Sequence, residues 1–457
     1  MNTDKYRFWF SFLFHKALLC SLRFSSLFTS INKQFILFIV LAIPSLVYSQ
    51  AVIKNVKILS IDTMDYSEVS DLKISKDGKI NDISVSKNYK ENDVRYAIPS
   101  FCDGYVTLGA NSAGGQNFEI GIKTALLSFL KHGFTHIQSV GDGPWIRNIQ
   151  SEILKGKISG PDITISERPI IAKTEEYPNL PIELYFSGKT DDEIWEEFTK
   201  QISSESKNIH VYFRFFHDDD FQINSSVLNK MNLLAQEKGK TIIFNPFADK
   251  SSILLALSSG ISYIEHPIPS SLSKEMSIQH LKSLNWMPLF GVYYLQKLQG
   301  NEEKLGEIST KWKAKSDYYK KKYSPVFDSM KGKKELTNEQ LLQAEKEFKS
   351  YSAFLKKNPT LSEKMLLGSG SGHFLTFPGI SGIFELEIIN SILKNGYQSL
   401  HIPTRNTCRF ITDANSSKIE KGENANILLF NSDPLDNFDI LYSPLQIFKN
   451  GKDVTPR

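Results

Sequence analysis

From residue 97 to about residue 400, short apolar runs alternate with amphipathic stretches. The apolar runs predict eight strands, at 97–102, 134–140, 162–167, 208–216, 240–245, 261–265, 287–292 and 364–369. Stretches with apolar residues three and four positions apart predict helices between them, for example at 118–132, 190–204, 225–238 and 381–394. Such a succession predicts an α/β fold, a (β/α)8 barrel of the TIM type at about residues 96–404. A doubly wound sheet is the structural alternative.

Shorter strands with turns between them flank this region on both sides. They are predicted at 52–61, 71–74, 80–86, 426–430 and 445–448. Asp77-Gly78 is a hairpin signal between two of them. We expect residues 51–95 and 408–457 to form one small composite β-sandwich.

Residues 301–358, between the last two predicted barrel strands, are rich in Lys and Glu and contain no apolar strand. Thr337 and Gln340 have the spacing of a helix capping box there, as Thr190 and Glu193 have earlier in the chain. The segment is either a solvated helical insertion or a face that binds phosphate, a glycan or a partner protein.

Residues 1–49 predict a targeting segment. An apolar run at 35–47 follows Lys33 and ends in Val47-Tyr48-Ser49, the pattern of a secretory signal cleaved before Gln50. We therefore expect an exported protein, periplasmic or secreted. A second apolar stretch at 8–29 leaves open an uncleaved N-terminus that anchors the chain to a membrane.

The charge balance argues against a nucleic-acid partner. The chain has 54 basic and 50 acidic residues, and residues 1–49 contain five of the former and one of the latter. The remainder carries 49 of each sign, so no basic field remains. The three cysteines, Cys20, Cys102 and Cys408, lack the spacing of a zinc site, and a bridge between the last two stays open.

Six segments carry recognisable motifs in a fixed order: 97–103 (AIPSFCD), 133–142 (GFTHIQSVGD), 156–163 (GKISGPDI), 259–266 (SGISYIEH), 366–369 (LLGS) and 421–428 (KGENANIL). They resemble motifs of the amidohydrolase superfamily, in its imidazolonepropionase-like and prolidase-like branch. The resemblance spans residues 51–457 and implies a barrel with a two-ended β-sandwich. It also implies hydrolysis of C–N bonds by water that zinc or a pair of divalent ions activates.

Five of the six metal-ligand positions implied by this resemblance hold residues that do not ligate. They are Tyr105 and Thr107 for the first-strand HxH pair, Tyr212 for the fourth-strand lysine, a histidine-free segment 244–248, and Gly370 for the eighth-strand aspartate. Only His266 matches. We therefore predict a catalytically degenerate member without metal or other cofactor, which binds a small molecule, an active relative or a second copy of itself.

The residues expected to line its cleft are Asp103, Tyr105, Tyr212, Arg214, Glu265 and His266. Tyrosine offers contact area plus a hydroxyl, and arginine binds carboxylates. Plain structural roles are the alternative: His266 as a cap of its strand and Glu265 as a polar residue of the barrel packing.

The competing functional hypothesis is a hydrolase of amide, cyclic amide or dipeptide bonds with a relocated site. In it His210, His217 and His373 would join His266 around zinc or another divalent metal.

Overall fold

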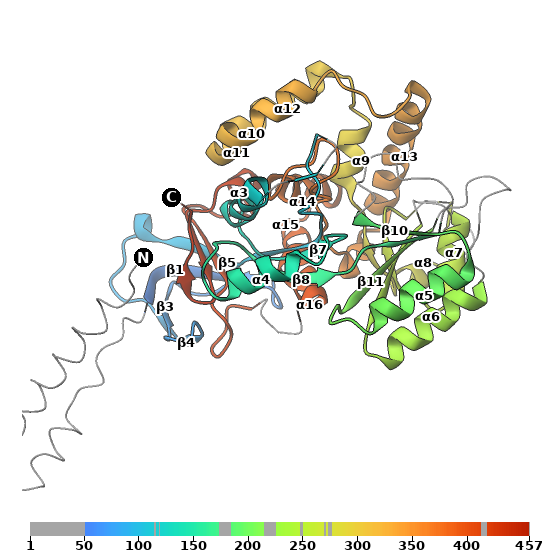
Figure 1. The fold of residues 1–457 in the computed structure, drawn as a ribbon. Helices are drawn as coiled ribbons and strands as arrows, with labels where there is room; N and C mark the ends of the chain where they lie inside the picture. Colours follow the sequence, from blue (N-terminus) through green and yellow to red (C-terminus); the bar gives the residue numbers. More distant parts are fainter. Residues whose placement is uncertain are drawn as a thin grey trace, which may run out of the picture. The chain divides into compact units, whose positions relative to one another are not determined.

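The computed structural model describes residues 51–113, 116–117, 119–172, 184–213, 225–246, 250–268, 271–272, 277–412 and 418–456 (Figure 1). The predicted targeting segment, Arg214 and His217 lie outside these residues. Within the described ranges no helix is long and apolar enough to cross a membrane.

Both ends of the described chain build one sheet of eight strands. Its order is β17-β16-β15-β5-β1-β3-β4, with β2 paired to β1. The strands are β1 (Ala51–Ser60), β2 (Asp65–Tyr66), β3 (Ser70–Ile74), β4 (Ile80–Val85), β5 (Arg95–Pro99), β15 (Ile427–Phe430), β16 (Gln446–Lys449) and β17 (Lys452–Asp453). β15 joins the two ends, because it pairs antiparallel with β5, with Leu428 opposite Ile98.

The hairpin predicted at Asp77-Gly78 is present, since β3 and β4 pair antiparallel. Gly78 has a φ of 83°, and a Cβ at this position would lie 2.1 Å from the carbonyl oxygen of Asn450. Only glycine permits this approach of the turn to the C-terminal strands.

The other strands run parallel in two curled sheets. One has the order β6-β7-β8 and the other β10-β9-β11-β12-β13-β14. The strands are β6 (Phe101–Val106), β7 (Phe134–Val140), β8 (Asp162–Ser166), β9 (Ile170–Ala172), β10 (Phe186–Gly188), β11 (Asn208–Phe213), β12 (Thr241–Asn245), β13 (Tyr263–Glu265) and β14 (Asn285–Met287). The fold is therefore mixed α/β, as predicted.

Hydrogen bonds link the edges of these two sheets. Ser166 Oγ donates to the Asn208 carbonyl oxygen at 2.8 Å, between β8 and β11. On the other side, Leu366 N donates to Trp286 O and Gly104 N donates to Leu367 O, both at 2.8 Å. The segment 365–367 thus lies between β14 and β6.

Three predicted strands differ from the structure. No strand forms at 364–369, where only Met365 pairs, in an isolated parallel bridge with Trp286. The strand expected at 97–102 is divided at Ser100, so that β5 belongs to the eight-stranded sheet and β6 to the parallel one. The strand expected at 287–292 ends at Met287, and helix α9 (Phe290–Gln296) follows. A short apolar run that is buried on all sides fits a strand and a helix equally well, so periodicity does not separate them.

The predicted helices coincide with α3 (Glu119–Lys131), α5 (Asp191–Ile202), α6 (Ser225–Glu237) and α14 (Ile380–Leu393). Two further helices are α4 (Ile146–Leu154) and α7 (Lys250–Ser258). The capping box at Thr337 is complete. At Thr190 it is partial, because the Glu193 carboxylate accepts from Lys189 N instead of the cap residue.

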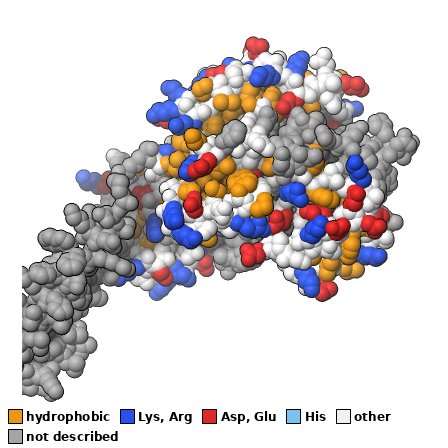
Figure 2. Space-filling view, viewed as in Figure 1, with side chains coloured by type: hydrophobic (Ala, Val, Ile, Leu, Met, Phe, Trp, Pro, Cys, Tyr) orange, Lys and Arg blue, Asp and Glu red, His pale blue; other side chains and the backbone are white. Residues whose placement is uncertain are grey.

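The segment 301–358 is helical, with α10 (Glu302–Lys315), α11 (Asp317–Lys322), α12 (Ser324–Met330) and α13 (Asn338–Lys357). Its aromatic residues face inward: Trp312 and Tyr319 are fully buried, with ring centroids 5.2 Å apart. They are therefore not available to stack on a ligand. On the face shown in Figure 2 basic and acidic side chains are interspersed, as the balanced charge predicts.

A disulfide joins Cys102 of β6 to Cys408 of α16 (Thr407–Ile411), across 306 residues of sequence. It ties the C-terminal helix to the first strand of the parallel sheet and answers the question that the cysteine count left open.

Candidate functional site

Two positions of the expected metal site contact each other directly. Tyr105 of β6 and Tyr212 of β11 are 3% and 2% exposed, and their hydroxyl oxygens lie 2.7 Å apart in a hydrogen bond. They belong to an apolar cluster with Met287 and Val292. The two tyrosines are thus buried in the packing and do not face the open cleft that we expected.

The other expected positions are also engaged in structural contacts. Thr107 Oγ1 donates to the Val140 carbonyl oxygen at 3.0 Å. Gly370 has a φ of 60°, and a Cβ there would lie 2.5 Å from Val292 Cγ2. No side chain therefore fits at Gly370 without displacing a neighbour.

His266 directly follows β13 with a φ of 72°, and its Nδ1 is hydrogen bonded to the Tyr293 hydroxyl. The ring of Tyr293 stands edge-on to the imidazole, with centroids 5.4 Å apart. The hydrogen bond connects His266 to α9, the helix that contains Tyr293.

Asp103 is fully buried and holds two segments together. Its Oδ1 accepts from Tyr105 N at 3.1 Å and from Ser369 N at 2.9 Å. Its Oδ2 has no partner among the described residues. Burial raises the pKa of Asp103 to about 7, because a charged carboxylate is poorly solvated there.

A chain of buried polar side chains crosses the interior from β7 to β13. Asn208 Nδ2 donates to Gln138 Oε1 at 3.0 Å, and Gln138 Nε2 lies 3.0 Å from His210 Nε2. His210 Nδ1 lies 2.6 Å from Glu265 Oε1 in an ion-pair contact, although neither atom has an aligned hydrogen bond. Gln138 and Asn208 are not among the site residues predicted from the sequence. The available signal was the period of two, which places positions 208, 210 and 212 on one face of β11.

Glu385 of α14 was also missed. Its carboxylate accepts from Phe290 N at 3.0 Å and from Gly291 N, at the start of α9. Burial raises the pKa of Glu385 to about 8. These contacts assign it to positioning α9.

Among the described residues, the histidines of the alternative relocated site do not form one cluster. His373 stacks on Tyr105, with ring centroids 5.7 Å apart, and burial lowers the pKa of His373 to about 4. His210 is engaged by Glu265, and His217 lies outside the described residues. In the part of the chain that the structure describes, no three His, Cys, Asp or Glu side chains are grouped to hold a metal ion. The groups at the expected positions do not fit zinc: two phenols bonded to each other, a threonine hydroxyl that donates to a backbone carbonyl, and a glycine without a side chain.

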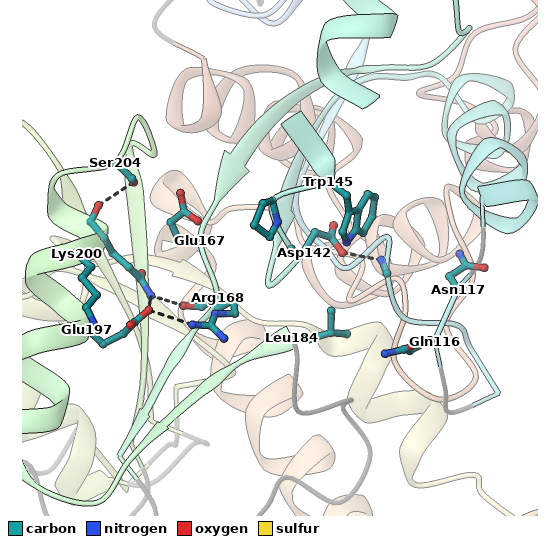
Figure 3. A pocket seen from close by; sticks show the side chains of 14 residues that line it. Gln116, Asn117, Asp142, Trp145, Glu167, Arg168, Leu184, Glu197, Lys200 and Ser204 are labelled. Atoms are coloured by element: carbon teal, nitrogen blue, oxygen red, sulfur yellow. Dashed lines mark hydrogen bonds and ion pairs between the residues drawn. The ribbon is translucent and has the colours of Figure 1, made fainter. Parts of the chain in front are cut away.

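A cavity of about 710 Å³ is lined by other residues than those at the expected metal positions (Figure 3). It is bordered by the segments that follow β6, β7 and β8, and by α5. Asp142 lies at its wall, and its carboxylate already has several hydrogen-bond donors. Its carboxylate accepts from Gly109 N at 2.6 Å, Leu108 N at 3.0 Å and Ser139 Oγ at 2.5 Å.

Solved structures share the arrangement of most of this chain. A putative prolidase from Bifidobacterium longum matches with a TM-score of 0.67, covering 89% of this chain and 94% of the other at 14% identity. The chain has the fold of the prolidase-like amidohydrolases. A Xaa-Pro dipeptidase with bound methionine in its active site gives a TM-score of 0.63, with 89% and 99% covered at 14% identity. The A. niger ochratoxinase gives 0.64, with 89% and 96% covered at 13% identity.

No protein-family model and no curated protein sequence matches this chain. The amidohydrolase resemblance carried by the six motifs is confirmed at the level of the fold. At 11–14% identity the prolidase-like fold says nothing about which residues of this chain act.

Proposed function

We propose that this chain is a prolidase-like amidohydrolase that has lost its metal and binds a ligand without hydrolysing it. The observation that carries the proposal is the 2.7 Å hydrogen bond between Tyr105 and Tyr212. These residues stand where the resemblance expects a histidine and the metal-binding lysine. Neutral phenols that bond to each other within an apolar cluster are poor ligands for zinc.

A hydrolase with a relocated site is the second candidate, and the contact between His210 and Glu265 favours it. A buried imidazole beside a carboxylate is an arrangement that general acid–base catalysis uses. Similar structures are named as prolidases and dipeptidases, so the reaction to test is hydrolysis of C–N bonds.

Metal analysis of the purified chain separates the two candidates. We expect zinc, iron and manganese far below one ion per chain, and no hydrolysis of dipeptides or cyclic amides with these metals added. About one metal per chain, released in His373→Ala but retained in His280→Ala, would support the relocated site instead. His280 is the matched control, because it is an exposed histidine on the short helix α8 (Ile278–Leu281).

The same proposal includes a closed (β/α)8 barrel and export of the mature chain. The bonds of segment 365–367 to Trp286 and Gly104 support closure. The disulfide supports export, because such bonds persist in oxidising compartments. N-terminal sequencing from the native host should begin at or near Gln50. A mature chain that retains residues 8–29 would mean a membrane anchor.

A further inference from the structure

We propose that the 710 Å³ cavity beside β6, β7 and β8 binds a neutral saccharide. This deepens the proposed function, since it names where a non-hydrolysing chain would hold its ligand and of what class. The cavity has the size of small-molecule sites.

Its position is typical of ligand sites in α/β folds. Gly109 and Asn117 follow β6, Gly143 and Trp145 follow β7, and Arg168 follows β8. Ligands of parallel sheets bind in this way at the carboxyl ends of the strands. None of the residues at the expected metal positions lines the cavity, so the site is distinct from the filled interior.

The charges on its wall already have partners, which favours a neutral ligand. Glu167 is bound by Arg147 of α4 and accepts from Ser206 Oγ at 3.0 Å. Arg168 lies 3.5 Å from Glu197. A charged ligand would therefore have to compete with an existing ion pair.

The other charged side chains that line the cavity also have partners. Lys200 lies 2.9 Å from Glu196, and Asp142 accepts three hydrogen bonds from the protein. A neutral ligand that only forms hydrogen bonds does not have to compete with these ion pairs.

An apolar surface with Trp145 lies across the cavity from Glu197 and Lys200, while Asp142 lies next to Trp145 (Figure 3). The Trp145 indole lies against two glycines: a Cβ at Gly109 would be 3.2 Å from Cζ2, and one at Gly143 would be 3.1 Å from Cδ1. Leu184 borders the same space. Aromatic rings that expose part of a face pack against the C–H surface of a sugar ring.

Planar polar side chains complete the match to a saccharide. The amide of Asn117, the guanidinium of Arg168 and the carboxylate of Glu167 supply both donors and acceptors around the cavity. Vicinal hydroxyl groups, each a donor and an acceptor, pair with such groups. The existing contacts do not use all of this capacity, since a guanidinium has about five donors and a carboxylate about four acceptor sites, and a purely apolar ligand would leave the remainder unused.

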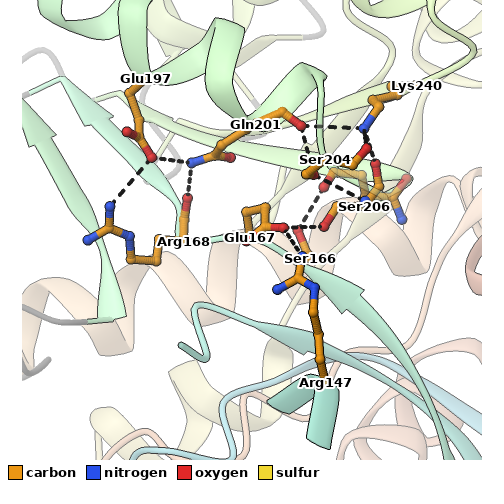
Figure 4. A network of polar contacts seen from close by, with 10 residues as sticks. Arg147, Ser166, Glu167, Arg168, Glu197, Gln201, Ser204, Ser206 and Lys240 are labelled. Carbon is orange, nitrogen blue, oxygen red and sulfur yellow. Dashed lines mark hydrogen bonds and ion pairs between the residues drawn. The ribbon is translucent and has the colours of Figure 1, made fainter. Parts of the chain in front are cut away.

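Contacts behind the wall hold it in place (Figure 4). Gln201 Nε2 donates to Arg168 O at 2.8 Å and to Glu197 Oε1 at 3.1 Å. Lys240 Nζ donates to the carbonyl oxygens of Ser204, at 2.5 Å, and of Ser206, at 2.7 Å. A wall fixed before binding lowers the entropy lost when a ligand is bound.

The test is isothermal titration calorimetry of the full mature chain. The neutral probes are glucose, galactose, mannose, N-acetylglucosamine, cellobiose and diacetylchitobiose. Glucuronate and glucosamine are the charged counterparts of glucose. We expect at least one neutral probe to bind, with about tenfold lower affinity in Trp145→Ala, because stacking on the indole is lost. Trp145→Phe should retain part of the affinity, and it keeps the test valid should the alanine variant not fold.

Trp195→Ala is the matched control, because Trp195 is a partly buried tryptophan of α5 that does not line the cavity. It should bind like the wild type. Three results would overturn the inference: no neutral probe binds, Trp195→Ala loses as much affinity as Trp145→Ala, or the charged sugars bind better than glucose. Metal content is measured separately, so the two proposals can fail independently. Saccharide binding by a chain that contains zinc would reject only the proposed function. A metal-free chain that binds no saccharide would reject only the inference about the cavity.

Discussion

Restoring the missing aspartate at Gly370 should destabilise the protein without creating a metal site. In Gly370→Asp the new Cβ meets Val292 Cγ2 at 2.5 Å, while the backbone keeps a φ of 60°. Carbon atoms pack at about 3.5–4.0 Å, so Val292 or the backbone has to move.

The magnitude follows from two contributions. Placing an L-residue in the left-handed region lowers the free energy of unfolding by about 1–2 kcal/mol. Inserting a group into a well-packed core typically lowers it by about 1–3 kcal/mol more. We therefore expect the free energy of unfolding of Gly370→Asp to fall by about 2–5 kcal/mol.

Urea unfolding followed by circular dichroism measures this loss, with zinc determined on the same samples. Gly370→Ala should behave similarly, because its Cβ meets the same atom. Gly239→Asp is the matched control: Gly239 has a φ of 65°, but a Cβ there would meet nothing within 4 Å, so only the backbone contribution of about 1–2 kcal/mol remains. A Gly370→Asp protein as stable as Gly239→Asp, or one that binds about one zinc per chain, would refute the reasoning.

Two further predictions concern pH and redox state. Burial raises the pKa of Asp103 to about 7 from 3.8. The contribution of protonated Asp103 to the free energy of unfolding is therefore fully present below about pH 4 and is lost as the pH rises through 7. In Asp103→Asn the decline in stability between pH 4 and 8 should therefore shrink, by on the order of 4 kcal/mol in urea titrations, and an unchanged decline would contradict the assignment. Cys408→Ser removes a link across 306 residues and should lower stability by about 4–6 kcal/mol, and a reductant should then have no further effect on the variant. Equal unfolding midpoints of the wild type with and without reductant would contradict this.

Local pattern determined much of the secondary structure. The helix predicted at 225–238 is α6 at Ser225–Glu237, and the strand predicted at 134–140 is β7 with the same bounds. These elements depend on the spacing of apolar residues within one segment, which the sequence displays directly. The ordered motifs likewise predicted the prolidase-like fold that the solved structures share.

Contacts between distant segments were decided only by the tertiary structure. The hydrogen bond between Tyr105 and Tyr212 spans 107 residues, and the disulfide spans 306. In the terminal sheet β5 lies between β1 and β15, and β15 is more than 300 residues away along the chain. The sequence predicted which side chains occupy the expected metal positions, but it did not show that the two tyrosines fill the interior together. Packing of segments that are remote in sequence determines whether a polar side chain faces a cavity or a neighbour, and local periodicity contains no information about that choice.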